Sequence, residues 1–417
     1  MTPPRIGLTP TDATEAVLRE IRPLPTETVS ITEAIGLVLA RAISSPIDLP
    51  HWDNSAMDGY AVRASDVGTD GVILHIVDHI PAGAFGRRAI GSGECARIFT
   101  GAPIPDGADC VIRQEDTTAI ETAKVRVDDV RDVGRNVRRR GEDILRGSVV
   151  LERGTVVGPA QIGVLASVAT PSVEVHRRPT IAILSSGDEL ADLNERDAIL
   201  SGRKIASSNN YTMAAMARMA GAEVLDLGIV KDDLDETRKR LADAHGSALL
   251  VTSGGMSVGE HDYLRRILEG SGAACRFWRL RMRPGAPVGF GMIGGTPWIG
   301  LPGNPVSTMV TFELFVRPAI RKLMGHTQLF RRTTPVRVGE PIVTQAQLQH
   351  FLRVTLSVDD GELTARLTGA QGSGILTSMA RAHALLIVPE DRQRIEQGEI
   401  LSALLLDETI HVTSVPY

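Results

Sequence analysis

The sequence predicts a multidomain fold that combines a parallel α/β domain with β-rich parts, and three observations lead to this prediction. Residues 179–325 alternate short apolar runs with helical stretches, which is typical of a parallel sheet covered by helices on both faces. Residues 46–133 and the residues beyond 330 instead carry short β-rich runs between Gly and Pro turns. The length of 417 residues exceeds what one hydrophobic core usually supports.

Helical patterns occupy the N-terminal region. Residues 9–22 begin with Thr and Asp, which favour helix starts, and their apolar residues recur at helical spacing. Residues 30–40 begin with the Ser-x-x-Glu pattern of a capping box. After the β-rich insertion at 46–133, residues 134–178 return to a helical, apolar pattern. We therefore expect helices on both sides of that insertion.

The region from 179 to 325 contains the clearest succession of elements. Strands are expected at 180–186, 222–228, 247–253 and from 298, and helices at 209–221, 233–245, 260–270 and up to about 320. Beyond residue 330, the runs at 334–343, 351–358, 363–369 and 384–390 are again β-like. They predict a separate C-terminal sandwich or barrel.

Bulk composition excludes several classes of protein. The formal net charge of −5 gives no reason to expect binding to nucleic acid. Cys95, Cys110 and Cys275 form no CxxC pair, so neither a disulfide framework nor a cysteine-rich zinc site is expected. His75 and His79 have the pattern of exposed strand residues, which also argues against zinc. With no signal-peptide pattern and no long apolar stretch, we expect a cytoplasmic protein that does not span a membrane.

Four loops follow predicted strands, at the edge where parallel α/β sheets bind ligands. They are Ser185–Glu189, Lys231–Asp233, Ser253–Ser257 and Leu301–Pro305. In the third loop, Gly254 and Gly255 lack side chains, so backbone N–H groups can approach an anion, and Ser253 and Ser257 can donate further hydrogen bonds. Neither a Walker GK[ST] nor a GxGxxG motif is present. Phosphate binding and an ordinary strand–helix turn therefore both remain open.

Carboxylates near these loops favour a metal-bridged phosphate. Glu260 and Asp262 follow the glycine turn, and Glu189 and Asp232 lie at neighbouring strand ends. Carboxylates repel a phosphate unless a cation such as Mg²⁺ lies between them. Asp188 and Asp233 have a plainer interpretation as helix caps.

Two arginine clusters and one polar loop are further candidates. Arg279, Arg281 and Arg283 alternate, so a strand would place them on one face, opposite an anion or on a solvated edge. The cluster at 135–140 can hold a ligand or form only local ion pairs. Residues 51–63 have neither helical nor strand periodicity, which is typical of a functional loop or of a turn-rich surface loop.

Six of these stretches together resemble one family. "DNSAMDGYAVR", "TGAPIPDGAD", "NVRRRGEDI", "SSGDEL", "TSGGMSVGEHDY" and "GLPGNPVS" occur in the order found in molybdopterin molybdenumtransferase, the molybdenum-insertion enzyme related to the gephyrin E-domain. The resemblance covers nearly the whole chain. It implies a helical, elongated N-terminal domain (1–45 and 134–178) with a β-rich insertion (46–133), a molybdopterin-binding α/β domain (179–327) and a C-terminal β-barrel (328–417).

The resemblance also implies a reaction. Enzymes like this take adenylylated molybdopterin and molybdate, insert molybdenum into the dithiolene and release AMP with the help of Mg²⁺. They act as homodimers in the cytoplasm, with each active site shared between subunits, and a molybdopterin adenylyltransferase is the expected upstream partner. Neither nucleic acid nor a membrane is an expected partner.

The residues that match the family's functional positions fall into three groups. The catalytic group comprises Asp58, Thr100, Glu189, Asp232 and Asp262, of which Glu189, Asp232 and Asp262 are the expected metal ligands. The substrate-binding group comprises Arg138, Asp143, Ser253, Gly254, Gly255, Ser257, Arg279, Arg283, Pro302 and Pro305. Arg353 and Ser373, with Arg283, are expected near molybdate.

Several positions depart from the family's pattern. Where the family commonly has Lys-Pro-Gly-Lys-Pro, this chain has Arg283 at the first position and Ala286 at the fourth. Arg279 likewise replaces a usual Lys, and Ser207 stands where an acidic residue is common. Because arginine and lysine hold oxyanions differently, the choice between molybdate and tungstate stays open.

Two other classes of protein remain as alternatives. A nucleotide pyrophosphohydrolase resembling the competence-damage family would share the Gly-Gly turn, but not "DNSAMDGY" or the C-terminal barrel. A receptor-clustering scaffold like gephyrin would carry an appended domain or a long linker, for which 417 residues leave no room. The transferase remains the leading prediction.

Overall fold

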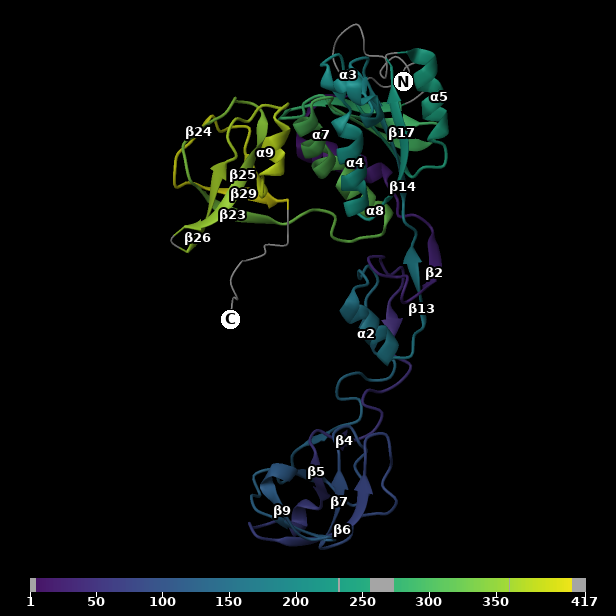
Figure 1. Ribbon diagram of the computed structural model, residues 1–417, viewed down its shortest axis with the longest axis vertical. Helices are drawn as coiled ribbons and strands as arrows, with labels where there is room; N and C mark the ends of the chain where they lie inside the picture. The colour runs from purple at the N-terminus through teal and green to yellow at the C-terminus, as the bar shows by residue number, and fades with distance from the viewer. Residues whose placement is uncertain (1–4, 232, 256–273, 360, 407–417) are drawn as a thin grey trace. The chain divides into compact units, whose positions relative to one another are not determined.

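The computed structural model describes residues 5–231, 233–255, 274–359 and 361–406. The chain divides into two compact units (Figure 1). The first unit comprises Met1–Val29, Ala34–Ala40 and Glu174–Tyr417, and the second comprises Ser30–Glu33 and Arg41–Val173. The helix expected at 260–270 lies outside the described residues. The division into four domains stays a prediction, and the two units are described separately below.

A seven-stranded sheet forms the centre of the first unit. Its strands, in spatial order, are β1 (Arg5–Leu8), β19 (Ala274–Leu280), β21 (Gly289–Ile293), β22 (Thr296–Leu301), β18 (Leu249–Ser253), β14 (Thr180–Ser186) and β17 (Glu223–Val230). The strands expected at 180–186, 222–228, 247–253 and from 298 are all present in it. β1 was not expected from the sequence, and it pairs with β19 at one edge.

The sheet is mixed, so the expectation of a wholly parallel sheet is wrong. β21 runs antiparallel to both β19 and β22. Only Gly294 and Gly295 separate β21 from β22, and both have positive φ, of 54° and 87°. A two-residue connection of this kind closes a hairpin, whereas a parallel connection needs a long crossover. The order β22-β18-β14-β17 is parallel, as predicted.

Helices cover both faces of this sheet because successive strand residues point to opposite sides. Ile181 and Ile183 belong to one core cluster, whereas Ala182 and Leu184 belong to another. On the first side lie α1 (Pro10–Glu20), α4 (Ser208–Met219) and the helical segment built from α7 (Pro305–Thr311), a π-helical turn (Phe312–Val316) and α8 (Arg317–Leu323). On the second side lies α5 (Leu234–Asp243). Figure 1 shows α4, α5, α7 and α8 around the sheet.

Helix α1 confirms the prediction made for residues 9–22. Thr9 is its N-cap, and the Thr9 hydroxyl accepts a hydrogen bond from the Asp12 N–H at 3.1 Å. Ala13 and Val17 are fully buried, as their helical spacing requires.

A closed β-barrel follows in the first unit, which confirms the C-terminal prediction. Strands β25 (Gln349–Asp359), β26 (Glu362–Leu367), β23 (Thr333–Val338), β29 (Ile400–Leu405) and β27 (Ala384–Val388) pair in this order, and β27 pairs back onto β25. The short strand β20 (Met282–Arg283) joins β25 from outside. Since β20 directly follows β19, this pairing brings the α/β sheet and the barrel together.

The second unit contains a six-stranded sheet. Its strands, in order, are β8 (Cys110–Arg113), β5 (Gly59–Val62), β7 (Glu94–Ile98), β6 (Ile73–Ile80), β10 (Lys124–Val127) and β9 (Thr117–Glu121). These strands correspond to the β-rich insertion expected from the sequence. The unit also contains α2 (Pro159–Ser167), a helix within the segment for which a helical pattern was expected.

The helix predicted at residues 30–40 is wrong. Strand β2 (Thr26–Ser30) ends there, turns follow, and Leu39 forms a β-bridge with Val175. The Ser30 hydroxyl bonds to the side chain and the N–H of Thr32, two residues on, instead of capping a helix. Gly36, at φ 75°, also interrupts the segment. The helical, elongated character of the N-terminal domain therefore stays a prediction.

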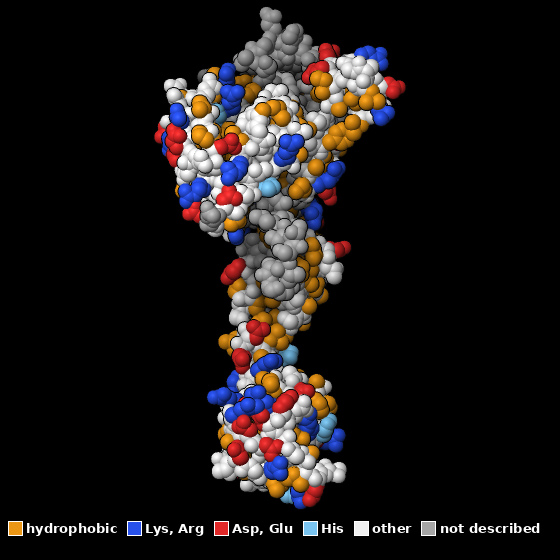
Figure 2. Space-filling model, turned by 60° about the vertical axis from the view of Figure 1, so that its left-hand side comes forward, with side chains coloured by type: hydrophobic (Ala, Val, Ile, Leu, Met, Phe, Trp, Pro, Cys, Tyr) orange, Lys and Arg blue, Asp and Glu red, His pale blue; other side chains and the backbone are white. Residues whose placement is uncertain are grey.

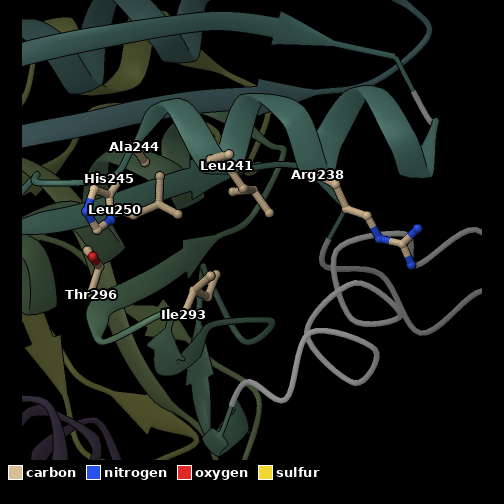
Figure 3. Close-up of a pocket in the computed structure, with 9 residues that line it drawn as sticks. Arg238, Leu241, Ala244, His245, Leu250, Ile293 and Thr296 are labelled. Atoms are coloured by element: carbon tan, nitrogen blue, oxygen red, sulfur yellow. The ribbon is translucent and has the colours of Figure 1, made fainter.

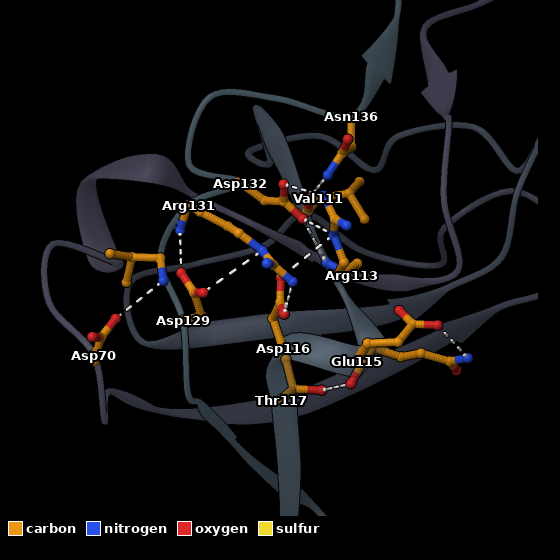
Figure 4. A network of polar contacts seen from close by, with 12 residues as sticks. Asp70, Val111, Arg113, Glu115, Asp116, Thr117, Asp129, Arg131, Asp132 and Asn136 are labelled. Carbon is orange, nitrogen blue, oxygen red and sulfur yellow. Dashed lines mark hydrogen bonds and ion pairs between the residues drawn. The ribbon is translucent and has the colours of Figure 1, made fainter.

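An ion-pair network anchors one edge of the six-stranded sheet (Figure 4). Arg113 donates two hydrogen bonds to the buried carboxylate of Asp132, at 2.7 and 2.9 Å, and Arg131 pairs with Asp116. The contact with Arg113 lowers the pKa of Asp132. The network fixes the segment leading to β11 (Val137–Arg138), which pairs with β4 (Asn54–Ser55).

Surface charge is mixed. On the face that Figure 2 shows, basic and acidic side chains are interspersed, in keeping with the net charge of −5. No helix among the described residues is long and apolar enough to cross a membrane.

Candidate active site

The glycine turn after β18 is required by the backbone. Gly254 has φ 89°, and a Cβ there would lie 2.3 Å from the backbone oxygen of Ser186. Gly255 also has positive φ, of 62°. The Gly254 N–H donates to the Leu301 backbone oxygen at 3.3 Å, which ties this loop to the end of β22. The turn thus needs glycine for its geometry, whatever it binds.

Three of the four predicted loops line one cavity of about 590 Å³. Its wall includes Gly187 and Glu189, then Ser253–Gly255, then Pro302–Pro305. The start of α4 completes it with Ser207, Ser208 and Asn209. All these segments follow or adjoin the carboxyl ends of β14, β18 and β22, where parallel sheets bind ligands.

The fourth loop, Lys231–Asp233, is described only in part. Asp233 caps α5, because its Oδ1 accepts from the N–H groups of Asp235 and Glu236 at 2.9 and 2.8 Å. This confirms the capping interpretation for Asp233. The same interpretation is wrong for Asp188, since the short strand β15 (Leu190–Ala191) follows it instead of a helix.

The wall of the large cavity contains buried polar atoms that have no hydrogen-bond partner among the described residues. They are Ser186 Oγ, Ser207 Oγ and Asn209 Oδ1. Ser207 is also the N-cap of α4 but makes no capping bond with its side chain. The first turn of α4 therefore offers N–H groups and a partial positive charge to this cavity. Buried polar groups without partners cost free energy unless a ligand or water satisfies them.

Asn209 also holds two of the loops together. Its Nδ2 donates to Ser253 Oγ at 2.7 Å and to the Gly303 backbone oxygen at 2.8 Å. Asn209 was not identified from the sequence as a site residue, whereas Ser186 belongs to the first predicted loop, Ser185–Glu189. The position of Asn209 at the start of α4, on the ligand-binding edge, is the only sequence signal that could have found it.

A second group of residues converges between the α/β domain and the barrel. A cavity of about 270 Å³ is lined by Arg283, Ala286, Pro302, Asn304 and Ser373, among others. The Asn304 side chain donates to Ser373 Oγ at 3.0 Å, so the Pro/Gly loop after β22 contacts the barrel here. A neighbouring cavity of about 400 Å³ is lined by Arg283, His350 and Arg353.

Arg353 is wholly buried in this region without a carboxylate partner among the described residues. Its Nε donates to Ser378 Oγ and its Nη2 to the Gly372 backbone oxygen, both at 3.0 Å. Nη1 has no partner. Burial lowers the pKa of Arg353 to about 10. A buried guanidinium with a free N–H group and no counter-ion is suited to an anion that enters from outside.

The three alternating arginines do not share one strand face, so that expectation is wrong. β19 ends at Leu280, and Arg279 just before this end has φ 67°. Arg281 pairs with Glu390 at 3.2 Å, while Arg283 donates to Gln345 Oε1 at 3.2 Å and lines both smaller cavities. All three side chains are exposed. Arg283 is thus the member of this cluster that reaches the second group, and a ligand at Arg279 stays a prediction.

The second unit presents a separate polar group. Asp58 Oδ1 accepts hydrogen bonds from the Thr100 N–H and hydroxyl, at 2.8 and 2.7 Å, and these bonds hold the pKa of Asp58 below its usual range. Arg139 pairs with Asp53 and Arg140 with Asp48, at 2.6 and 2.7 Å, so ion pairs form as expected, but with carboxylates distant in sequence instead of local ones.

Arg138 and Asp143 differ from their neighbours. Both side chains are exposed and form no ion pair within the described part of the chain. Arg138 therefore presents a free cation beside two arginines that are neutralised locally.

A further cavity, of about 280 Å³, is not a good candidate for a charged ligand (Figure 3). It lies beside the last turns of α5, near the first residues of β18 and β22, which is the opposite edge of the sheet from the glycine turn. Leu241, Leu250 and Ile293 face it, and Arg238 and His245 are its titratable lining residues. Convergent polar groups of the kind that mark a reactive site are missing from this described lining.

Comparison with known proteins covers nearly the whole chain. Residues 8–169 match the model of the MoeA N-terminal region (domain I and II), residues 182–322 that of a probable molybdopterin binding domain, and residues 335–406 that of the MoeA C-terminal region (domain IV). The molybdopterin molybdenumtransferase of Haemophilus influenzae is 33% identical over 94% of this chain and 97% of its own length.

The chain belongs to the molybdopterin molybdenumtransferase family. The relative of that name from Nostoc is 37% identical over 91% of this chain and 89% of its own length. A molybdopterin biosynthesis MoeA protein from Pyrococcus horikoshii has a similar structure, with a TM-score of 0.81 and 27% identity over 96% of this chain and all of that one. The resemblance seen in the sequence motifs is thereby confirmed.

Not all the residues expected from this family can be placed. Asp232, Asp262 and Ser257 lie outside the described residues, as does Glu260. Glu189 is the one expected metal ligand whose position is described, on the wall of the large cavity. Within the described ranges, no cluster of three His, Cys, Asp or Glu side chains forms a ready metal site.

Proposed function

We propose that this protein inserts molybdenum from molybdate into adenylylated molybdopterin and releases AMP with the assistance of Mg²⁺. Membership of the family supports the general activity. The single observation that carries the proposal further is Arg353, a buried cation with no counter-ion among the described residues, beside Arg283 and Ser373. A tetrahedral oxyanion such as molybdate matches this donor set. Tungstate has the same shape and charge and remains the alternative metal source.

The large cavity suits the pterin and phosphate portions of the second substrate. Ser186, Ser207 and Asn209 supply polar atoms that lack partners, and the uncapped start of α4 favours negative charge. Ser253, Gly254 and Gly255 line this cavity and are proposed to bind the phosphate region. Arg279 lies outside the described lining of the cavity, and on the family resemblance it is proposed as a peripheral phosphate ligand. Pro302 lines both the large cavity and the cavity of about 270 Å³ beside Arg283. Pro305 lines the large cavity. The two substrates would therefore meet at the Pro/Gly loop.

Glu189 fits the donor chemistry of Mg²⁺, because its carboxylate is exposed on the wall of the large cavity. Together with Asp232 and Asp262, it would hold the ion and position it beside the phosphoanhydride. Bound there, Mg²⁺ would neutralise charge that develops on the phosphate oxygens. Ser257 is proposed to bind the same phosphate region.

Asp58, Thr100, Arg138 and Asp143 are proposed to act on this substrate from the partner subunit of a homodimer. The free cation of Arg138 is suited to a phosphate group, and the low pKa of Asp58 keeps its carboxylate charged.

The proposal is tested by incubating the pure protein with adenylylated molybdopterin and measuring AMP. We expect release that requires both Mg²⁺ and molybdate, and that Asp58→Ala or Asp262→Ala abolishes it in folded protein. Equal release without any oxyanion would instead identify the protein as a pyrophosphohydrolase. Replacing molybdate with tungstate in the same assay distinguishes the two metal sources.

A further inference from the structure

The segment that carries Asp58 is held at three points. The carboxylate Oδ1 receives both hydrogen bonds from Thr100. The Asp58 backbone oxygen accepts from the Gln114 N–H at 3.0 Å. The next backbone oxygen, that of Gly59, accepts from Arg97 Nη1 at 2.8 Å. Only Oδ2 of this carboxylate has no bond to the described residues.

Arg97 links the last two of these points. Its Nη2 donates to Gln114 Oε1 at 2.5 Å while its Nη1 holds Gly59, so one guanidinium bridges β7, β5 and the 3₁₀ turn Gln114–Asp116. The two side chains flanking it are aromatic. The guanidinium carbon lies 4.7 Å from the ring centre of Phe99 and 5.2 Å from that of Tyr60. Stacking of this kind fixes the plane of the guanidinium and therefore the direction of its N–H groups.

The chain is closely packed at Gly59, the residue after Asp58. A Cβ at residue 59 would lie 2.0 Å from the Ile112 backbone oxygen, so the two chains approach too closely for any side chain. Glycine also leaves the backbone freer than other residues would. Arg97 binds the backbone oxygen of Gly59 directly, and through Gln114 it steadies the peptide group that precedes Gly59.

We propose that Arg97 is a positioning residue that orients the Asp58 carboxylate for the reaction of this site. The inference rests on the proposed function, because Asp58 is reactive only in that account. Arg97 has all its described contacts within the second unit, and none of the residues proposed to hold molybdate is among them. Its cation also helps, after Thr100, to hold down the pKa of Asp58.

A double-mutant cycle tests this inference. Arg97→Ala is expected to lower kcat by up to about 100-fold, as small misplacements of a catalytic group do, with the KM for molybdate unchanged. If Arg97 acts through Asp58, then adding Arg97→Ala to Asp58→Asn lowers the residual activity no further. Additive losses, or a wild-type kcat in the single variant, would overturn the proposal.

Matched variants separate positioning from folding. Arg88→Ala removes an exposed arginine that pairs with Glu94 in the same sheet, and it should leave kcat unchanged. Gln114→Ala removes one contact of Arg97 but keeps the charge and the stacking, so it should lower kcat by a smaller factor. If Arg97→Ala fails to fold, Gln114→Ala and its combination with Asp58→Asn give the same test. An inactive wild-type protein would refute the proposed function rather than this inference.

Discussion

At the scale of single residues, Arg353 has the environment that most directly indicates an anion. Burial disfavours the charged form of its guanidinium, which is why its pKa falls to about 10. Because this pKa lies below the usual value for arginine, the buried charge opposes folding at neutral pH, and that penalty is lost only as pH rises through about 10 toward the usual arginine pKa. An oxyanion that pairs with Arg353 would remove the penalty and so stabilise the folded state.

We predict that molybdate raises the melting temperature of the wild-type protein but not that of Arg353→Met. At 100 times its dissociation constant, a ligand adds about 2.7 kcal/mol to the free energy of unfolding. Arg366→Met is the control, since Arg366 lies in the same barrel but is exposed and paired with Asp359. Differential scanning fluorimetry with molybdate measures the shift. An equal shift in Arg353→Met would show that molybdate binds elsewhere.

Single residues also show where sequence reasoning reached its limit. Gly254, Glu189 and Pro302 were identified because loops after parallel strands gather at one edge of a sheet. Arg353 was identified through the family resemblance alone, since an arginine in a strand normally points to solvent. Asn209 and Arg97 were not identified as site residues, because each acts on segments that are distant in sequence. Such contacts exist only once the strands are paired.

At the scale of elements, the turn after β18 is built on glycine for two separable reasons. Gly254 has a positive φ of 89°, and a Cβ would also collide with the Ser186 backbone at 2.3 Å. Gly246 has nearly the same φ, 88°, but a Cβ there would have no neighbour within 4 Å. A comparison of Gly254 with Gly246 therefore separates the cost of the positive φ from the cost of a steric collision.

We predict that Gly254→Ala destabilises the protein more than Gly246→Ala does. The left-handed conformation costs each alanine about 1–2 kcal/mol, and only Gly254→Ala adds a collision with the backbone. Chemical denaturation compares the two free energies of unfolding. Activity should fall only in Gly254→Ala, because its loop lines the large cavity. Equal losses of stability would contradict this account of the turn.

Elements were predicted well where the local pattern and the tertiary contacts agree. Helix α1 has a cap, helical spacing and a buried face, and it was predicted almost to its ends. The segment at 30–40 has a capping-box pattern too, but its Ser30 bonds to Thr32 and its chain pairs with residue 175. The mixed sheet was missed because the direction of β21 depends on the two-residue turn at 294–295. The spacing of apolar residues along a strand does not show whether the strand runs parallel or antiparallel to its neighbours.

At the scale of the whole molecule, the account requires two chains for each active site. Asp58 belongs to the second unit and Arg353 to the first, and the proposal places the Asp58 of one subunit with the Arg353 of its partner. In a symmetric homodimer of this kind, each site takes one group from each subunit. A heterodimer with one defect per chain would then have one site with both defects and one site with neither.

We predict that heterodimers of Asp58→Ala and Arg353→Met chains are active although both homodimers are inactive. With one intact site of two, activity should be about half that of the wild-type dimer. The two chains can be co-expressed with different affinity tags and purified through both. Inactive heterodimers would mean that the two residues serve the same site from within one chain, and the shared-site proposal would be wrong.

The most direct test of the central claim is the metal content of the product. Wild-type protein, supplied with adenylylated molybdopterin, molybdate and Mg²⁺, should yield AMP and dithiolene-bound molybdenum in equal amounts, measured by chromatography and elemental mass spectrometry. Arg353→Met should yield neither at the same molybdate concentration. AMP formed without any molybdenum in the pterin product would contradict the claim.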